Sequence, residues 1–226
     1  VRFRPGQDVA LLNAMLHVIL AENLHDATFV AARVDGLDAL RAHLAGYAPD
    51  AVEARCGVPA AQIRRVARLF ATARAALTLW GMGISQSVHG TENARALIAL
   101  SLLCGQVGRP GTGLHPLRGQ NNVQGASDAG LIPMMLPDYH RTGDATYRAF
   151  LEEMWGATLD AKPGLTVVEI LHAAERGEIR GMYIMGENPA MSDPDLAHAR
   201  AVLARLEHLV VQDLFLTETA VLADVI

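Results

Sequence analysis

The residues best suited to bind a ligand lie between His115 and Gly130. This stretch combines Arg118 with four amide side chains among positions 120 to 124 and with several glycines. It lacks the apolar periodicity of an ordinary core helix or strand. A guanidinium is a planar, permanently charged fork that matches a carboxylate or a phosphate, and glycine lets backbone N–H groups come close to a ligand. The stretch therefore predicts a site for an anionic partner, whereas the alternative is a solvated, turn-rich loop.

A glycine turn follows the first apolar run that is typical of a strand. The run Ala76–Trp80 is rich in strand formers, and Gly81, Met82 and Gly83 come directly after it. In open parallel sheets, ligands collect at the carboxyl ends of strands, where loops and helix N-termini present free N–H groups. The turn does not match the G-x-G-x-x-G dinucleotide fingerprint, so a tight turn alone also explains it.

A second turn with chemical potential follows the strand predicted over 181–185. It consists of Gly186, Glu187, Asn188 and Pro189. The carboxylate of Glu187 suits the paired ring N–H and amine donors of a guanine, although these residue types also form a simple β-turn.

Two polar residues, Gln212 and Asp213, also lie at the carboxyl end of the strand predicted over 208–213. An acid at this place suits a ribose hydroxyl or a base, or it caps the helix that follows. Thr217 begins the next predicted turn and helix, over 217–222.

Helix and strand patterns alternate along the rest of the chain. Asp8 is expected to cap an amphipathic helix that runs to Ile19. Further helices are predicted over 37–44, 59–73, 91–104, 146–155, 167–176 and 195–206, and another strand from Asp224. The segment 131–164 is otherwise expected to be a meandering connector.

This order of elements predicts the α/β fold class, with two open, mainly parallel-sheet, three-layer (α/β/α) units of Rossmann-like type. We expect residues 1–120 to form the first cofactor-binding domain. Residues 121–226 are expected to form the connector and part of a second one.

Composition limits the class of protein and its partners. With 226 residues, 51% hydrophobic and 19% charged, the chain can bury a substantial core. A net charge of -5 and scattered basic residues argue against nucleic acid as a partner. The apolar runs are shorter than the roughly 20 residues of a membrane span, and no signal peptide is visible.

The two cysteines, Cys56 and Cys104, have no C-x-x-C spacing. They therefore predict neither an iron–sulfur cluster nor a zinc site in this chain, and they favour a reducing compartment. Cys104 lies on an apolar helical stretch and is expected in the core, whereas Cys56, near a predicted helix start, is expected to be more reactive.

No metal ligands are predicted among the histidines either. His89, His115, His140 and His172 are interpreted as surface or loop residues, because no metal-ligand spacing with partner acids was apparent.

The segment Leu117–Ala126, preceded by Gly108–Gly113, resembles the molybdenum- or tungsten-dependent formate dehydrogenases of the molybdopterin oxidoreductase superfamily. Similar segments occur in family order over 8–15, 80–83, 183–189 and 211–215. The resemblance therefore spans essentially the whole chain, and its Arg-Gly-Gln-Asn-Asn portion is similar to the formate branch specifically.

The resemblance implies a bis-molybdopterin guanine dinucleotide cofactor with Mo or W, held between two α/β domains. It implies that Arg118 lies beside the metal and holds formate by its carboxylate during oxidation to carbon dioxide. Contacts with the pterin are implied for Gly119 and Gln120, and contacts with the guanosine end for residues near 186–188 and 212–213. The full set of expected cofactor-binding residues is Gly81, Met82, Gly83, Gly119, Gln120, Gly186, Glu187, Asn188, Pro189, Gln212, Asp213 and Thr217.

Other parts of such an enzyme are implied to lie outside this sequence. They are the metal-ligating cysteine or selenocysteine with its histidine, the cysteines of a [4Fe–4S] cluster, and a C-terminal cap domain. Because the chain starts at Val1 and stops at Ile226 within an apolar run, we expect a piece of a longer alpha subunit. We also expect this piece alone to be inactive and to hold no cofactor.

The Ser-Asp-Ala-Gly sequence at 127–130 resembles the soluble, NAD-linked formate dehydrogenases. This implies a cytoplasmic enzyme whose partners are the remainder of the alpha subunit and the iron–sulfur and flavin (NAD-reducing) subunits. Two positions depart from many relatives, which have Asn at His115 and Cys at Ser127.

Two alternative functions remain open at this point. One is a non-catalytic homologue similar to the large iron–sulfur subunit of respiratory NADH dehydrogenases, although retention of Arg118 speaks against it. The other is a molybdoenzyme that acts on another oxyanion, such as nitrate, or on a sulfoxide.

Overall fold

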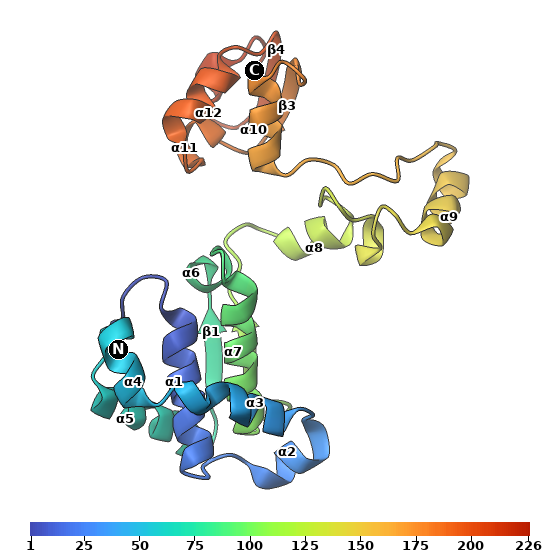
Figure 1. Ribbon diagram of the computed structural model, residues 1–226. Coiled ribbons are helices and arrows are strands. Elements are labelled where there is room, and N and C mark those ends of the chain that lie inside the picture. Colours follow the sequence, from blue (N-terminus) through green and yellow to red (C-terminus); the bar gives the residue numbers. More distant parts are fainter. The chain divides into compact units, whose positions relative to one another are not determined.

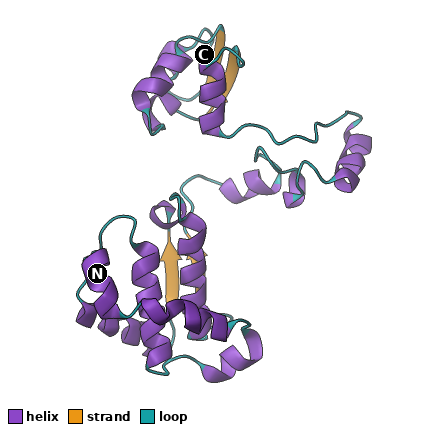
Figure 2. Ribbon diagram, viewed as in Figure 1, coloured by secondary structure: helices purple, strands orange, loops and turns teal.

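The computed structural model describes residues 1–226, which form two compact units, Val1–Val123 and Gln124–Ile226. Each unit contains helices and one parallel pair of strands (Figures 1 and 2). The predicted α/β class with parallel strands is confirmed. Each sheet has two strands, fewer than an open sheet normally contains. No helix combines the length and the apolar character needed to cross a membrane.

The first unit is built around one central helix, α1 (Asp8–Ala21). Its other helices are α2 (Ala27–Arg33), α3 (Leu37–His43), η1 (Leu44–Gly46), α4 (Pro49–Cys56), α5 (Ala60–Thr72), α6 (Met82–Ser85) and α7 (Gly90–Leu103). α1 packs against α4, α5 and α7 (Figure 1). Leu16 and Ile19 are fully buried there, and each contributes about 1.5–3 kcal/mol of hydrophobic stabilisation.

Two expectations for α1 are wrong. The helix is buried on most of its circumference, including Asn13, so it is a core helix and not an amphipathic one. Asp8 is its first residue and not its cap, since Gln7 occupies that position without a side-chain bond. Asp8 instead places a negative charge in the first turn, where it complements the helix dipole.

The sheet of the first unit pairs β1 (Leu77–Trp80) with β2 (Gly113–Pro116), and Trp80 lies opposite Pro116. The chain between them contains α6 and α7, as a crossover between parallel strands requires. β2 was not predicted: Gly113–Pro116 carries one apolar side chain, Leu114, between glycine and histidine, so the sequence shows no strand periodicity there. The hydrogen bonds with β1 hold this segment as a strand, although its own side chains do not favour one.

The second unit begins with short elements and ends in a small α/β lobe. The short elements are α8 (Val123–Asp128), η2 (Pro137–Tyr139) and α9 (Ala145–Trp155). The lobe contains α10 (Val167–Glu175), β3 (Gly181–Met185), α11 (Pro189–Ser192), α12 (Leu196–Leu203), β4 (His208–Gln212) and η3 (Ala220–Leu222). Helix α10 starts with a capping box in which Thr166 and Glu169 bond each other's backbone N–H groups.

Helices α10 and α12 pack together through Leu171, Ala199 and Val202, and a second cluster joins Leu209 and Val211 of β4 to Ala220. The strand expected from Asp224 is reduced to one parallel bridge between Val210 and Val225.

Candidate cofactor-binding edges

The structure brings the first glycine turn and the arginine segment to the same edge of the first sheet. Because β1 and β2 are parallel, Gly81–Gly83 and Leu117–Gln120 both follow the carboxyl ends of neighbouring strands. The backbone N–H of Leu117 donates to the carbonyl of Trp80 at 2.6 Å, which extends the pairing beyond β2. A Cβ atom on Gly81 would lie 3.8 Å from the carbonyl oxygen of Leu117.

Arg118 is exposed at this edge, and its guanidinium makes no hydrogen bond or ion pair. Arg109, in the same unit, shows the contrast. Its guanidinium donates to the carbonyls of Gly105 and Arg74 at 3.0 and 2.7 Å and to the Gln106 side chain at 3.1 Å. Arg109 is therefore a structural residue, whereas the charge of Arg118 is available to an anion.

The glycines of this edge leave room that the protein does not fill. A Cβ atom on Gly83 or Gly119 would meet no atom within 4 Å, and neither residue has a positive φ. The fold of the unit therefore does not itself require glycine at these positions. Close approach of a ligand to the backbone would require it, so these residues fit a bulky cofactor lying over the edge.

The second unit presents a similar edge. β3 and β4 are parallel with Met185 opposite Gln212, and the N–H of Gly186 donates to the carbonyl of Gln212 at 2.9 Å. Gly186 has φ 65°, a left-handed conformation that favours glycine, so the turn itself explains this residue. Gln212 accepts a hydrogen bond from the Tyr183 hydroxyl, and Asp213 accepts one from the N–H of Leu214 at 2.6 Å.

Asn188 ties the loop after β3 to the loop after β4. Its amide donates to Glu218 at 2.8 Å, and its carbonyl accepts from the hydroxyl of Thr219 at 2.8 Å. Pro189 is buried, and the Thr217 hydroxyl accepts a bond from the N–H of Ala220 at 3.2 Å. Among the predicted residues of this edge, Glu187 is exposed and makes no hydrogen bond or ion pair, so its carboxylate is the free acceptor.

Thr219 was missed by the sequence analysis, although it organises this edge. It is fully buried, and its hydroxyl also accepts the N–H of Ala190 at 3.0 Å. A threonine near a predicted helix start is a common cap residue, so only the fold reveals that it joins two loops.

A polar cluster around Tyr139 was also missed. The amide of Gln124 donates to the Tyr139 hydroxyl at 2.8 Å and to the Asp128 carboxylate at 2.9 Å. Mainly because of its hydrogen bond with Asp128, the pKa of Tyr139 is raised above its ordinary value. Neutral Tyr139 therefore remains a hydrogen-bond donor at physiological pH.

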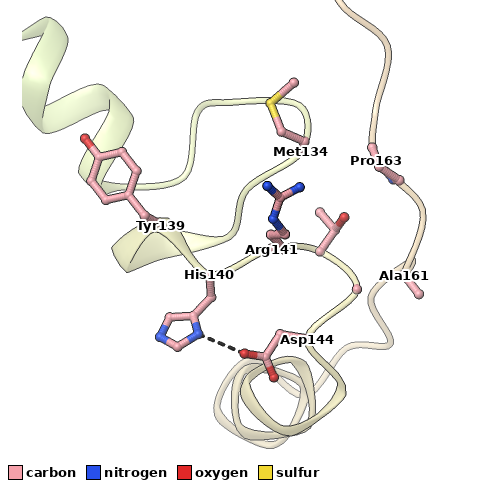
Figure 3. A pocket seen from close by; sticks show the side chains of 9 residues that line it. Met134, Tyr139, His140, Arg141, Asp144, Ala161 and Pro163 are labelled. Carbon is pink, nitrogen blue, oxygen red and sulfur yellow. Dashed lines mark hydrogen bonds and ion pairs between the residues drawn. The ribbon is translucent and has the colours of Figure 1, made fainter. Parts of the chain in front are cut away.

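A pocket of about 610 Å³ lies beside this cluster (Figure 3). Arg141 extends its guanidinium between Met134 and Pro163, and it makes no hydrogen bond or ion pair. On the other side of the pocket, the His140 ring lies 3.0 Å from the Asp144 carboxylate. The free charge of Arg141 suits an anionic group, but no predicted site residue lines this pocket.

The four histidines lie on the surface or in loops as expected, but the expected absence of partner acids is wrong. His140 forms an i,i+4 pair with Asp144, and His172 forms an i,i+3 pair with Glu175 at 3.8 Å. Partner acids at helical spacing were therefore present in the sequence. His115 lies exposed on β2, and His89 precedes α7.

The structure places both cysteines in the core. Cys104 is 5% exposed, as expected, and burial raises its pKa to about 11, with a further contribution from the charge of Asp26. Cys56 is 0% exposed and ends α4, where its thiol faces the carbonyls of Glu53 and Val58. The expectation of a reactive Cys56 near a helix start is therefore wrong.

Comparison with known proteins identifies the family of this chain. The family described as molybdopterin oxidoreductase matches residues 1–226. Formate dehydrogenase H of Escherichia coli (strain K12) is 44% identical over 100% of this chain and 32% of its own length. The F420-dependent formate dehydrogenase subunit alpha of Methanocaldococcus jannaschii is also 44% identical, over 98% of this chain and 32% of its own length. This chain thus spans about a third of these curated relatives.

A solved structure shares the fold. Acetylene hydratase from Pelobacter acetylenicus superposes with a TM-score of 0.72 and 22% identity, over 99% of this chain and 33% of that chain. At this level of identity the likeness concerns the fold alone.

Proposed function

This chain belongs to the molybdopterin oxidoreductase family, and we propose that it is the central cofactor-binding portion of a molybdopterin-dependent formate dehydrogenase. The reaction is the oxidation of formate to carbon dioxide, which releases one proton and two electrons. The relatives that carry formate dehydrogenase in their names support this substrate. The observation that carries the proposal is the unpaired guanidinium of Arg118 at a glycine-lined strand edge.

The two edges are the proposed cofactor-binding surfaces. We assign the pterin region to Gly81, Met82, Gly83, Gly119 and Gln120, where open space lies over the backbone. We assign the guanosine end of one cofactor half to the edge formed by Gly186–Pro189, Gln212, Asp213 and Thr217. When bound, a bis-molybdopterin guanine dinucleotide would supply a Mo or W centre that accepts the two electrons.

Glu187 is the proposed recognition group for guanine. Its free carboxylate offers two acceptor oxygens, which match the ring N–H and the exocyclic amine of this base. Asn188 is committed to bonds with Glu218 and Thr219, so its role is to hold the loop and not to select the base.

Arg118 is the proposed substrate-binding residue. A guanidinium binds a carboxylate through two parallel N–H···O bonds, which fix its plane as well as its position. This fixes the direction of the C–H bond of formate and lowers the entropic cost of reaching the reactive geometry. The positive charge also raises the local concentration of the anionic substrate.

The test is to replace Arg118 in the complete enzyme. Arg118→Lys keeps the charge but loses the planar fork, and a charge-assisted hydrogen bond contributes about 1.5–3 kcal/mol. We therefore expect kcat/KM for formate to fall about tenfold to a hundredfold, and further in Arg118→Ala. Arg65→Lys is the matched control, because Arg65 is exposed on α5 without a hydrogen bond or ion pair. Unchanged formate turnover in Arg118→Ala contradicts the proposed role.

For the electron acceptor we propose the NAD-linked, cytoplasmic type with iron–sulfur and flavin partner subunits. The Ser127-Asp128-Ala129-Gly130 sequence supports this choice. The relative from Methanocaldococcus jannaschii is named F420-dependent, which makes F420 the rival acceptor. Formate-dependent reduction assayed separately with NAD and with F420 distinguishes the two.

A further inference from the structure

Three potential metal ligands that are not among the proposed cofactor-binding residues converge on the surface of the second unit. His172 and Glu175 lie on α10, and His198 lies on α12. One ligand atom from each residue can be chosen so that all three lie within 4.8 Å of one another. We propose that these residues form a binding site for a zinc-class divalent metal ion, which links α10 to α12.

The distances suit a small ion with nitrogen and oxygen ligands. Oε2 of Glu175 lies 3.2 Å from Nε2 of His198 and 3.8 Å from Nδ1 of His172. Two ligands at about 2.0–2.1 Å from a tetrahedral Zn²⁺ lie roughly 3.3 Å apart. The side chains of His172 and Glu175 are 55% and 48% exposed, so they have room to rotate toward a shared ion.

The surroundings of His198 favour a cation over a simple hydrogen bond. Its Nε2 atom is buried and has no hydrogen bond of acceptable geometry, although a carboxylate oxygen lies close to it. In the tautomer that leaves Nε2 without a proton, this nitrogen is an acceptor and repels a carboxylate. A metal ion between the two groups is attracted by both.

A fourth ligand position is open. A pocket of about 170 Å³ is lined by both histidines and by Asp193 and Asp195. Asp195 caps α12 by accepting the N–H of His198, whereas the Asp193 carboxylate makes no hydrogen bond or ion pair. Water or the Asp193 carboxylate can complete a tetrahedral set, and two histidines with one glutamate form a known zinc donor set.

The site would stabilise the packing of the lobe. α10 and α12 precede β3 and β4, and they contact each other through a small apolar cluster that includes Leu171, Ala199 and Val202. A shared ion adds a cross-link to this modest interface and stabilises the folded state by an amount that rises with the logarithm of the free metal concentration above its Kd.

Zinc titration of the chelator-treated chain tests the proposal. We expect the unaltered chain to bind one more equivalent of Zn²⁺ than His198→Ala. We also expect Zn²⁺ to raise the melting temperature of the unaltered chain, whereas Mg²⁺ should not, because Mg²⁺ prefers oxygen ligands. Glu175→Gln keeps the volume of the side chain and removes its charge. We expect the affinity for Zn²⁺ to fall at least tenfold, because even the loss of a residue that only hydrogen-bonds to a metal ligand typically lowers metal affinity by this factor.

The control variant is His208→Ala. His208 is an exposed histidine of the same unit and lies 3.8 Å from Asp224. Bound Co²⁺ provides a spectroscopic readout, because Co²⁺ in a tetrahedral site gives visible absorption bands. These bands should be lost in His172→Ala and in Glu175→Gln and should remain in His208→Ala. Equal Zn²⁺ stoichiometry in all variants, or absence of the bands in the unaltered chain, overturns the proposal. Neither readout depends on formate turnover, so failure here leaves the proposed function untouched.

Discussion

The carbonyl oxygen of the Asn188 side chain accepts hydrogen bonds from both the backbone N–H and the hydroxyl of Thr219, at 3.1 and 2.8 Å. Asn188 follows β3 and Thr219 follows β4, so one amide joins the loops after two parallel strands. The edge that we assign to the guanosine end of a cofactor is therefore fixed by bonds within the protein, before any ligand binds.

Thr219→Val is expected to loosen this edge. Valine keeps the shape of threonine but leaves the buried N–H of Ala190 without its acceptor, which costs about 1–3 kcal/mol. Amide hydrogen exchange should show faster exchange at Ala190 than in the unaltered chain. Thr158→Val is the control, because Thr158 is exposed and its hydroxyl makes no hydrogen bond. Equal protection of Ala190 in both variants contradicts the assigned role.

Gly119→Ala and Gly186→Ala should separate a ligand requirement from a backbone requirement. Gly186 has φ 65°, so alanine there should destabilise the second unit by about 1–2 kcal/mol. Gly119 has no positive φ and open space around it, so alanine should leave the melting temperature unchanged. In the complete enzyme, Gly119→Ala should lower the molybdenum or tungsten content per protein. An unchanged metal content argues against close approach of the cofactor to this backbone.

Neither thiol should react with an alkylating reagent in the native chain at pH 8. Burial raises the pKa of Cys104 to about 11, and the thiolate is the reactive form. Cys56 is inaccessible because it is 0% exposed. Both should react after denaturation, and Ala61→Cys, at an exposed position of α5, should add one rapidly labelled thiol. Rapid labelling of the native, unaltered chain is the contrary result.

The start of α9 should lose stability only in strong acid. Asp144 accepts the N–H groups of Thr146 and Tyr147, both at 3.1 Å, and its pKa is lowered, first by the His140 ring and then by the Tyr147 N–H. A lowered folded-state pKa means that the stabilisation is fully present above the ordinary value of 3.8 and is lost as the pH falls through the folded-state pKa.

Nuclear magnetic resonance titration of the Tyr147 amide should therefore show a midpoint below 3.8. Asp144→Asn keeps the cap and should remove this titration. A midpoint at or above the ordinary value would mean that the pair with His140 does not persist in solution.

Local patterns predicted most of the regular elements. The apolar runs over 77–80, 181–185 and 208–212 form strands, and the periodic segments after them form helices. Short elements without periodicity were not predicted, among them β2, α6 and α11. Each has four residues, too few to display a pattern, so its structure depends on neighbours that are distant in sequence.

The candidate site shows the same division. Arg118 and the strand-end glycines could be identified because charge, amides and glycine are unusual in combination. The sequence did not reveal three other groups of interacting residues, because their members belong to different elements or loops. They are the Thr219–Asn188 pair, the cluster around Tyr139, and the cluster of His172, Glu175 and His198.

The amino-acid sequence alone determined the α/β class and the unusual combination of residue types between His115 and Gly130, because periodicity, glycine turns and an arginine among amides are local properties. Only the tertiary structure decided that Gly81 and Arg118 follow neighbouring strands. The same holds for the hydrogen bond between Asn188 and Thr219 and for the closeness of His198 to Glu175. Strand pairing and helix packing bring together residues whose separation along the chain carries no signal of their contact.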